Sequence, residues 1–351
     1  MPMVAEVVDA VVGGDTHKHT HTLEMLSPVG ARLAGLQIDN DEAGFAAAAA
    51  WIVEHAPGPR VIVGLEGTRS YGIGLSRALQ AAGLVVVEVE RPKRTQRHGR
   101  GKSDPIDAHL AAVQVLGMRT DRLPIPRADG DREALRILLV ARHEMTNTQT
   151  RCRNQLKALL HTGDEFERSM SSGHLNQARL TTIIRRRGTD TESRLQTIRR
   201  EEARRLAQTV RDIARELTAN HKQLRQLVAS IAPDLLAKRG IGPVSAAQAI
   251  ISWSHRGRCR NEAAFAKLAG APPIPASSGK TVRHRLNRGG DRQLNAALHT
   301  IAMTRWRSCP RTADYIDRRR AQGKTDREIR RVLKRYIARE IYRTLNAAPA
   351  A

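Results

Sequence analysis

The first forty residues alternate between apolar and polar positions in a way that predicts strands. An apolar stretch over residues 7–12 leads into Gly13-Gly14-Asp15, and two further stretches with strand character cover residues 20–26 and 31–38. Short turns separate the three stretches. Strands joined by short turns are typical of an antiparallel meander, so we expect the chain to begin with one.

Between residues 41 and 116, helical and strand patterns alternate along the chain. Short apolar runs between turns indicate buried strands, and longer amphipathic or Ala-rich segments indicate helices. We expect helices over 41–55, 71–82 and 104–116, and strands over 60–65 and 84–89. A meander followed by alternating helices and strands predicts an α/β domain with a mixed sheet.

Two long segments further along carry apolar residues at heptad-like spacing. The first covers 135–159, with Arg142 and Gln149 as polar interruptions, and the second covers 195–231. This spacing predicts two helices that form an antiparallel coiled-coil hairpin or a seam between two copies of the chain. Plain packing of two helices inside one domain is the alternative. The basic residues 161–192 would form a linker at the tip.

From residue 238 onward the pattern is helical and rich in small residues. The sequence Gly240-Ile241-Gly242-Pro243 opens a helix and is similar to a helix-hairpin-helix turn, whose backbone N–H groups face a phosphate. The alternative is that Gly240-Ile241-Gly242-Pro243 is an ordinary Gly-Pro helix start without a binding role. We expect a loop over 271–290 and helices over 291–307 and 325–345, the last of which begins with a Thr-x-x-Glu capping box.

Charge is distributed unevenly along the 351 residues, whose net charge is +24. The first 90 residues hold 5 basic and 11 acidic side chains, a net charge of −6, so the remainder carries +30. A strongly basic remainder predicts a polyanionic partner, and an aromatic content of 3% argues against extensive base-stacking surfaces. The acidic segment is either an ordinary domain surface or a source of cation ligands.

Cysteine content and hydropathy exclude several classes of protein. Cys152, Cys259 and Cys309 lie far apart and form neither a CxxC pair nor a disulfide framework. The chain has no apolar run of about 18 residues and no secretory signal pattern, so we expect a cytoplasmic protein without a membrane partner.

Four carboxylates occupy positions where the predicted fold would bring them together. Asp15 ends the first strand, Glu66 ends a buried strand, and Asp104 and Asp107 begin a helix. Such residues converge on one edge of a sheet, where their oxygens would hold hard divalent cations for phosphodiester chemistry. Each residue also has an ordinary structural interpretation, such as a helix cap for Asp104 or a turn residue for Asp15.

Two further groups are candidates for chemistry. His17, His19 and His21 alternate, which on one strand would place all three on the same face, but a solvated strand start is the interpretation we favour. Ser277-Ser278-Gly279 lies in a Pro- and Gly-bounded loop that suits a nucleophile or a phosphate contact. The cations around this loop are Lys280, Arg283, His284, Arg285, Arg288 and Arg292.

The motifs taken in order resemble those of the DEDD-type insertion-sequence transposases. The motifs similar to the amino-terminal half of that family are Gly14-Asp15-Thr16-His17-Lys18, Glu66-Gly67-Thr68-Arg69-Ser70-Tyr71-Gly72 and Gly101-Lys102-Ser103-Asp104-Pro105-Ile106-Asp107-Ala108. Those similar to its carboxy-terminal half are Gly240-Ile241-Gly242-Pro243, Phe265-Ala266-Lys267-Leu268-Ala269-Gly270, Ala276-Ser277-Ser278-Gly279 and Arg288-Gly289-Gly290-Asp291-Arg292-Gln293-Leu294-Asn295. Each motif is modest alone, but the ordered set covers nearly the whole chain.

The resemblance implies an α/β RNase H/RuvC-like domain, a helical coiled-coil segment and a mainly α-helical domain with a catalytic serine. We place these at residues 1–128, 129–232 and 233–351. The family's D-E-D-D set falls on Asp15, Glu66, Asp104 and Asp107, which would bind Mg²⁺. Its serine falls on Ser278, with Ser277 as an assistant or substitute. The cations that would contact nucleic acid are Arg97, Lys102, Lys280, Arg283, Arg285, Arg288 and Arg292.

The resemblance also implies an activity and partners. Its members are site-specific DNA recombinases that act on donor and target DNA, are guided by a structured bridge RNA and assemble as dimers or tetramers. We therefore expect a transposase that cuts and rejoins DNA through a phosphoserine link. The alternatives are a hydrolytic RuvC-like nuclease or junction resolvase, in which Ser278 only binds DNA, and a non-catalytic nucleic-acid-binding protein.

Overall fold

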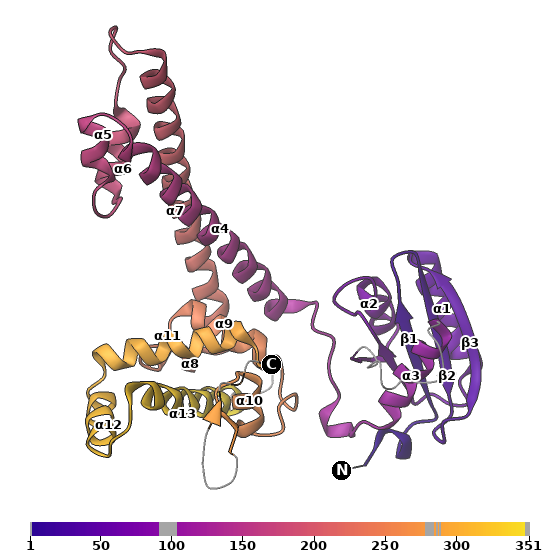
Figure 1. The fold of residues 1–351 in the computed structure, drawn as a ribbon. Coiled ribbons are helices and arrows are strands. Elements are labelled where there is room, and N and C mark those ends of the chain that lie inside the picture. Colours follow the sequence, from indigo (N-terminus) through magenta and orange to yellow (C-terminus); the bar gives the residue numbers. More distant parts are fainter. Residues whose placement is uncertain (1, 91–103, 278–283, 286, 288, 348–351) are drawn as a thin grey trace. The chain divides into compact units, whose positions relative to one another are not determined.

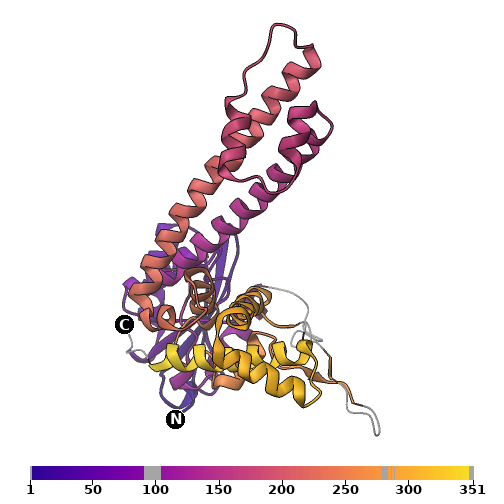
Figure 2. The same cartoon turned by 90° about the vertical axis from the view of Figure 1, so that its left-hand side faces the viewer.

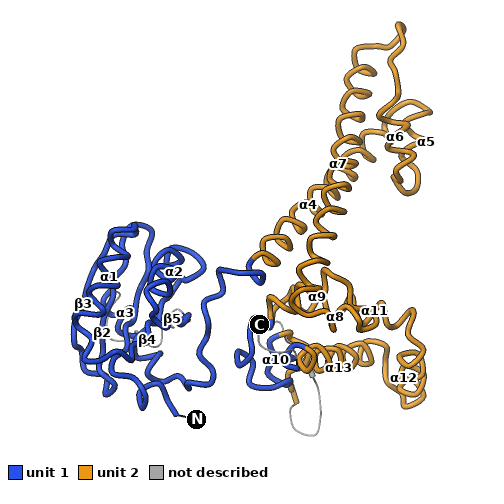
Figure 3. Tube along the Cα trace, turned by 180° about the vertical axis from the view of Figure 1, so that it is seen from behind, with its two compact units in different colours: residues 1–133, 253–268, 345–350 blue, residues 134–252, 269–344, 351 orange. Residues whose placement is uncertain are grey.

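The computed structural model describes residues 2–90, 104–277, 284–285, 287 and 289–347 (Figure 1). Among the helices in these ranges, none is both long enough and apolar enough to cross a membrane. The chain divides into two compact units (Figure 3). The first combines residues 1–133 with 253–268 and 345–350, and the second combines 134–252 with 269–344. The predicted domains at 1–128, 129–232 and 233–351 stay predictions.

A five-stranded sheet forms the centre of the first unit, with the strand order β3-β2-β1-β4-β5. Its strands are β1 (Ala10–Thr16), β2 (Thr20–Leu26), β3 (Arg32–Asp39), β4 (Val61–Leu65) and β5 (Val85–Glu88). The first three strands are antiparallel neighbours, whereas β4 runs parallel to β1 and β5 runs parallel to β4. The predicted meander and the predicted mixed sheet are therefore confirmed.

Helices cover both faces of this sheet and bury two separate cores (Figure 1). Helices α1 (Glu42–His55) and α2 (Ile73–Ala81) cover the face to which β1 presents Ala10 and Val12. Helix α3 (Asp104–Leu116) covers the opposite face, on which Val11 lies against Ala111 and Ala112. Side chains alternate along a strand, so Gly13 and Asp15 share the α3 face with Val11.

Gly13 allows α3 to lie directly against β1. A Cβ atom at this position would meet the carbonyl oxygen of Ala108 at 2.0 Å and the backbone nitrogen of Ala112 at 2.3 Å. Both atoms belong to the helix backbone, which has no flexible side chain that could move aside. Glycine at position 13 therefore sets the distance between strand and helix.

The two long predicted helices are present and pair within one chain (Figures 1 and 2). Helix α4 (Gly130–His161) and helix α7 (Arg194–Ile231) run antiparallel. Gln149 Nε2 donates to the Val210 carbonyl at 3.2 Å, and Asn220 Nδ2 donates to the Leu138 carbonyl at 2.9 Å. The intrachain hairpin is thus confirmed, while its coiled-coil geometry stays a prediction.

The tip of the hairpin differs from the expected linker. Residues 161–192 include two short helices, α5 (Glu165–Ser171) and α6 (Gln177–Arg185). Leu180 and Ile183 pack in one core with residues of α4 and α7. Buried Glu167 accepts hydrogen bonds from Arg186 and Arg199. The tip therefore shares a core with the hairpin instead of forming a plain linker.

Two apolar positions that the heptad pattern placed in the hairpin seam are exposed instead. Leu195 is 67% exposed and Ile198 is 50% exposed. They lie in the first turns of α7, and the buried stripe of this helix begins at Ala203.

The rest of the described chain is mainly helical, as predicted. Its helices are α8 (Pro233–Ala237), α9 (Pro243–Trp253), α10 (Glu262–Leu268), α11 (Arg292–Ser308), α12 (Pro310–Ala321) and α13 (Asp326–Ala347). The Thr325–Glu328 capping box at the start of α13 is present. Within the predicted loop over 271–290, Ile274–Pro275 (β6) pairs with His284–Arg285 (β7) as a short antiparallel ladder. The loop is therefore the end of a β-hairpin.

The close approach of α3 gives the first testable prediction. Gly13→Ala should lower the free energy of unfolding by at least about 1–3 kcal/mol, because the new methyl group forces the α3 backbone away from β1. Gly117→Ala is the matched control, since its nearest neighbour would lie at 3.7 Å and its φ is negative. Urea unfolding of both variants checks this, and equal stabilities would contradict it.

Candidate functional site

Three of the predicted carboxylates lie where strand β1 ends against the start of α3. Asp15 is the next-to-last residue of β1, and Asp104 and Asp107 lie in the first turn of α3. Asp15 and Asp107 are buried, at 5% and 4% exposure, whereas the side chain of Asp104 is 46% exposed. One carboxylate therefore opens to solvent while two are enclosed.

Glu66 follows β4, the strand beside β1. Its backbone N–H donates to the Gly14 carbonyl at 3.0 Å, and its own carbonyl accepts from Thr16 Oγ1 at 2.8 Å. The next residue, Gly67, has a φ of +68°, which glycine adopts without strain. These contacts hold the Glu66 backbone beside the end of β1, next to Asp15, as the sequence predicted.

His17, for which the sequence left open a metal ligand and a solvated strand start, lies beside two of these carboxylates. Its Nε2 lies 3.2 Å from Asp15 Oδ2 and 3.4 Å from Asp104 Oδ1. One ligand atom from each of these three residues lies within 4.8 Å of the other two, which is close enough to hold one metal ion. His17 lies in the turn after β1, two residues after Asp15.

Negative charge accumulates at this site. Burial raises the pKa of Asp15 above its ordinary value of 3.8, and the nearby charges of Asp107 and Asp104 raise that pKa further, although His17 opposes them. Ionising these groups together is unfavourable unless a cation lies among them. Carboxylate oxygens are the ligands that hard divalent cations prefer, so the donor set fits such an ion.

A part-buried hydrogen bond secures α3 on the sheet near this cluster. Glu24 of β2 lies opposite Gly13 of β1 and accepts a hydrogen bond from His109 Nδ1 at 2.8 Å. The side chain of Glu24 is 7% exposed, and Arg32 Nε lies 3.7 Å from it. Because His109 and the two aspartates belong to the same helix, this contact helps to fix Asp104 and Asp107 over β1.

Several of the predicted nucleic-acid residues fall outside the described residues. These are Ser278, Arg97, Lys102, Lys280, Arg283 and Arg288. Of the others, Arg285 lies in β7 and Arg292 begins α11, and both are exposed. Asp291 caps α11 by accepting from the N–H groups of Gln293 and Leu294, and it also accepts from Ser252 Oγ at 2.6 Å. The position of Arg292 is therefore well defined.

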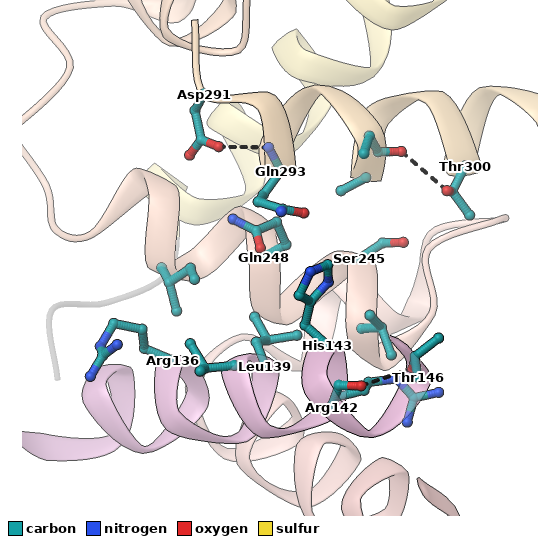
Figure 4. Close-up of a pocket in the computed structure, with 15 residues that line it drawn as sticks. Arg136, Leu139, Arg142, His143, Thr146, Ser245, Gln248, Asp291, Gln293 and Thr300 are labelled. Atoms are coloured by element: carbon teal, nitrogen blue, oxygen red, sulfur yellow. Dashed lines mark hydrogen bonds between the residues drawn. The ribbon is translucent and has the colours of Figure 1, made fainter. Parts of the chain in front are cut away.

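Two cavities of the second unit adjoin this region. One, of about 580 Å³, lies between α4, α9 and the start of α11, with Asp291 and Gln293 at one side and His143 at another (Figure 4). The second, of about 490 Å³, lies between α13 and the segment 271–273 that leads into β6. We call its lining the basic groove, and its cations are Arg319, Lys324, Arg331 and Arg335. The sequence motifs did not indicate these four residues, because they come from two helices and a loop.

Family models match both parts of the chain. A model of the DEDD transposases of the IS110 type, described as a transposase, matches residues 12–163, which include all four predicted carboxylates. A second model, described as a transposase of the IS116/IS110/IS902 family, matches residues 233–317, which include Ser278. With the carboxylate cluster, these matches define the chain as a DNA transposase, an enzyme that cuts and joins DNA.

Curated relatives give the same result over nearly the full length. The chain is 25% identical to the "Insertion element IS110 uncharacterized 43.6 kDa protein" of Streptomyces coelicolor, over 91% of this chain and 90% of that protein. It is also 25% identical to the "Insertion element IS900 uncharacterized 42 kDa protein" of Mycobacterium paratuberculosis, over 89% of each chain. The chain belongs to the IS110 family of insertion-element transposases.

The charge at the carboxylate cluster gives a second prediction. Asp15→Asn should stabilise the metal-free protein at neutral pH, because the amide removes a buried charge that Asp104 and Asp107 repel. The raised pKa of Asp15 means that its protonated form stabilises the fold at low pH and that this stabilisation is lost as the pH rises through the raised value. The advantage of the variant should therefore vanish as the pH falls towards 3.8.

Thermal unfolding with chelator or with added Mn²⁺ checks this prediction. Added metal should raise the melting temperature of the unmodified protein and leave that of Asp15→Asn unchanged. Glu54→Gln is the control, since the Glu54 side chain is 76% exposed, and this variant should behave like the unmodified protein. Equal metal responses in all three proteins would refute the assignment of Asp15.

Proposed function

We propose that this transposase is a site-specific DNA recombinase in which a metal-binding carboxylate site and Ser278 act together. The observation that carries the proposal is the meeting of Asp15 and Asp104, which come from distant segments, at the end of β1. Further support comes from the family matches, which include both the carboxylates and the serine. The first unit is accordingly an RNase H/RuvC-like domain, with α3 carrying the last two carboxylates.

The carboxylates and the serine have separate tasks in this proposal. Asp15, Glu66, Asp104 and Asp107 hold Mg²⁺, and the bound ion supplies a Lewis acid that offsets charge on a phosphate oxygen. The Ser278 hydroxyl attacks the scissile phosphorus, so a bond forms between Oγ and phosphorus while the bond to one deoxyribose oxygen breaks. The serine proton passes to the departing oxygen or to water.

The second half of the reaction reverses these bonds on a new strand. A free hydroxyl of the partner strand attacks the phosphoserine, which restores the Ser278 hydroxyl and forms a new phosphodiester. Because one ester replaces another at each step, no nucleotide cofactor is needed. Arg285 and Arg292, with Lys280, Arg283 and Arg288, hold the backbone near the serine, while Arg97 and Lys102 contact nucleic acid beside the carboxylates.

The excess of positive charge supports nucleic acids as the partners. Donor and target DNA are bound through their phosphates, and a bridge RNA encoded by the element selects sequence by base pairing, as in other RNA-guided systems. The basic groove supplies further phosphate contacts in the second unit. We propose that the protein acts in the cytoplasm as a dimer or tetramer, in which carboxylates of one protomer serve Ser278 of another.

A covalent-trapping assay tests the phosphoserine. Purified protein is mixed with Mg²⁺, total RNA from cells carrying the element and end-labelled DNA spanning the element junction, and is then denatured in SDS. Label should migrate with the protein. It should be lost in Ser278→Ala, in Asp15→Asn and without metal, because each change removes the nucleophile or its metal site.

Ser277→Ala is the matched control and should retain the adduct. Free nicked fragments that persist in Ser278→Ala without any adduct would favour a hydrolytic nuclease or junction resolvase. Unchanged DNA processing in the carboxylate variants would favour a protein that only binds nucleic acid. Circular dichroism of each variant excludes loss of folding.

The basic groove gives a separate prediction about salt. Each phosphate contact contributes a slope of about −0.9 to the dependence of log K on log salt concentration. Lys324→Ala with Arg331→Ala should therefore reduce the slope by about 2 on a duplex of arbitrary sequence. Arg205→Ala on α7, whose guanidinium pairs with Glu202, is the control and should leave the slope unchanged. Fluorescence anisotropy at several salt concentrations measures it, and an unaltered slope in the double variant would exclude the groove as a contact.

A further inference from the structure

His17 has a well-defined place beside the carboxylates. It lies in the turn between β1 and β2, where its backbone N–H donates to the Thr20 carbonyl at 3.0 Å and closes the turn. The contacts of its Nε2 atom place the imidazole beside Asp15 of β1 and Asp104 of α3. The side chain is 42% exposed, so the imidazole lies at the mouth of the cluster, where an ion would enter.

The Nε2 atom of His17 lies close to the carboxylates of both Asp15 and Asp104. The atom is 3.2 Å from Asp15 Oδ2 and 3.4 Å from Asp104 Oδ1, so a single nitrogen faces two oxygens that carry like charge. A neutral imidazole has a single N–H. When that N–H donates to one carboxylate, the other carboxylate faces the same nitrogen without a proton of its own from His17. A divalent cation among the three atoms is attracted to all of them, with Nε2 offering its lone pair.

We infer that His17 Nε2 is a protein ligand of the ion held by Asp15 and Asp104, and that the site therefore favours Mn²⁺ over Mg²⁺. The inference rests on the proposed carboxylate site and adds a nitrogen donor to it. Imidazole suits transition metals, whereas Mg²⁺ is held by oxygen. A mixed nitrogen and oxygen donor set thus discriminates between two ions that a purely carboxylate site would accept alike.

The two neighbouring histidines, His19 and His21, lie in surroundings that differ from those of His17. His21 is fully buried, where it stacks on Phe45 and shares a 3.0 Å hydrogen bond with Asn40. Its environment is that of a core residue. His19 is exposed at the top of the turn, outside the cluster of ligand atoms. His19→Gln is therefore a matched control for His17→Gln.

Electron spin echo envelope modulation of Mn²⁺ bound to the untagged full-length protein tests the inference directly. The unmodified protein and His19→Gln should show the ¹⁴N modulation of one imidazole, and His17→Gln should not. The Mn²⁺ dissociation constant should rise on the order of tenfold in His17→Gln, while that of Mg²⁺ changes much less. His17→Asp is a second variant that should retain Mn²⁺ and lose the nitrogen signal, because an oxygen replaces the nitrogen.

Other outcomes overturn the inference in distinguishable ways. If Mn²⁺ requires Asp15 but shows no ¹⁴N modulation, or if the modulation persists in His17→Gln, His17 is not a ligand and the carboxylate site stands. If Mn²⁺ binds equally well to Asp15→Asn, the carboxylate site of the proposed function fails, and the role of His17 fails with it.

Discussion

The close contact between helix α3 and strand β1 determines the geometry of the candidate metal site. The α3 backbone passes so near position 13 that only glycine fits there, and the helix therefore begins directly beside the end of β1. Asp104 and Asp107 thus reach Asp15 because two rigid backbones touch, without long or flexible side chains. The part-buried hydrogen bond between Glu24 and His109 adds a second contact to the same helix. Groups held on rigid elements keep the geometry that catalysis needs.

The same geometry creates an electrostatic conflict that a bound cation would relieve. Buried Asp15 and Asp107 and half-exposed Asp104 place like charges together. A DNA phosphate would be repelled by this surface, whereas a bound divalent ion reverses the sign of the local field. Residues 91–351 carry a net charge of +30, which favours contacts with DNA phosphates, and a divalent ion at the carboxylates would allow a phosphate to approach them.

The sequence predicts most of the first unit because its signals are local. Alternation identifies the strands, and the Asp-Pro start of α3 marks the first residue of that helix. The convergence of Asp15 with Asp104 is not local. The sequence indicated it because strand ends and a helix start were expected to meet at one sheet edge, and the family motifs pointed to the same residues. For His17 the alternating pattern left a metal ligand and a solvated strand start open, because its contacts with Asp15 and with Asp104 of α3 depend on the tertiary structure. The tip helices were missed because they are short, and their apolar side chains become part of a core only together with residues of α4 and α7.

Polar residues explain why the long helices pair within the chain. Arg142 and Gln149 interrupt the apolar heptads of α4, yet they donate to the carbonyls of Leu217 and Val210 on α7. Asn220, which is buried, returns a hydrogen bond to α4. A shift of register would leave these donors without acceptors, at a cost of roughly 1–3 kcal/mol for each buried group. The three bonds therefore select one antiparallel register, and the chain's own second helix fills the seam.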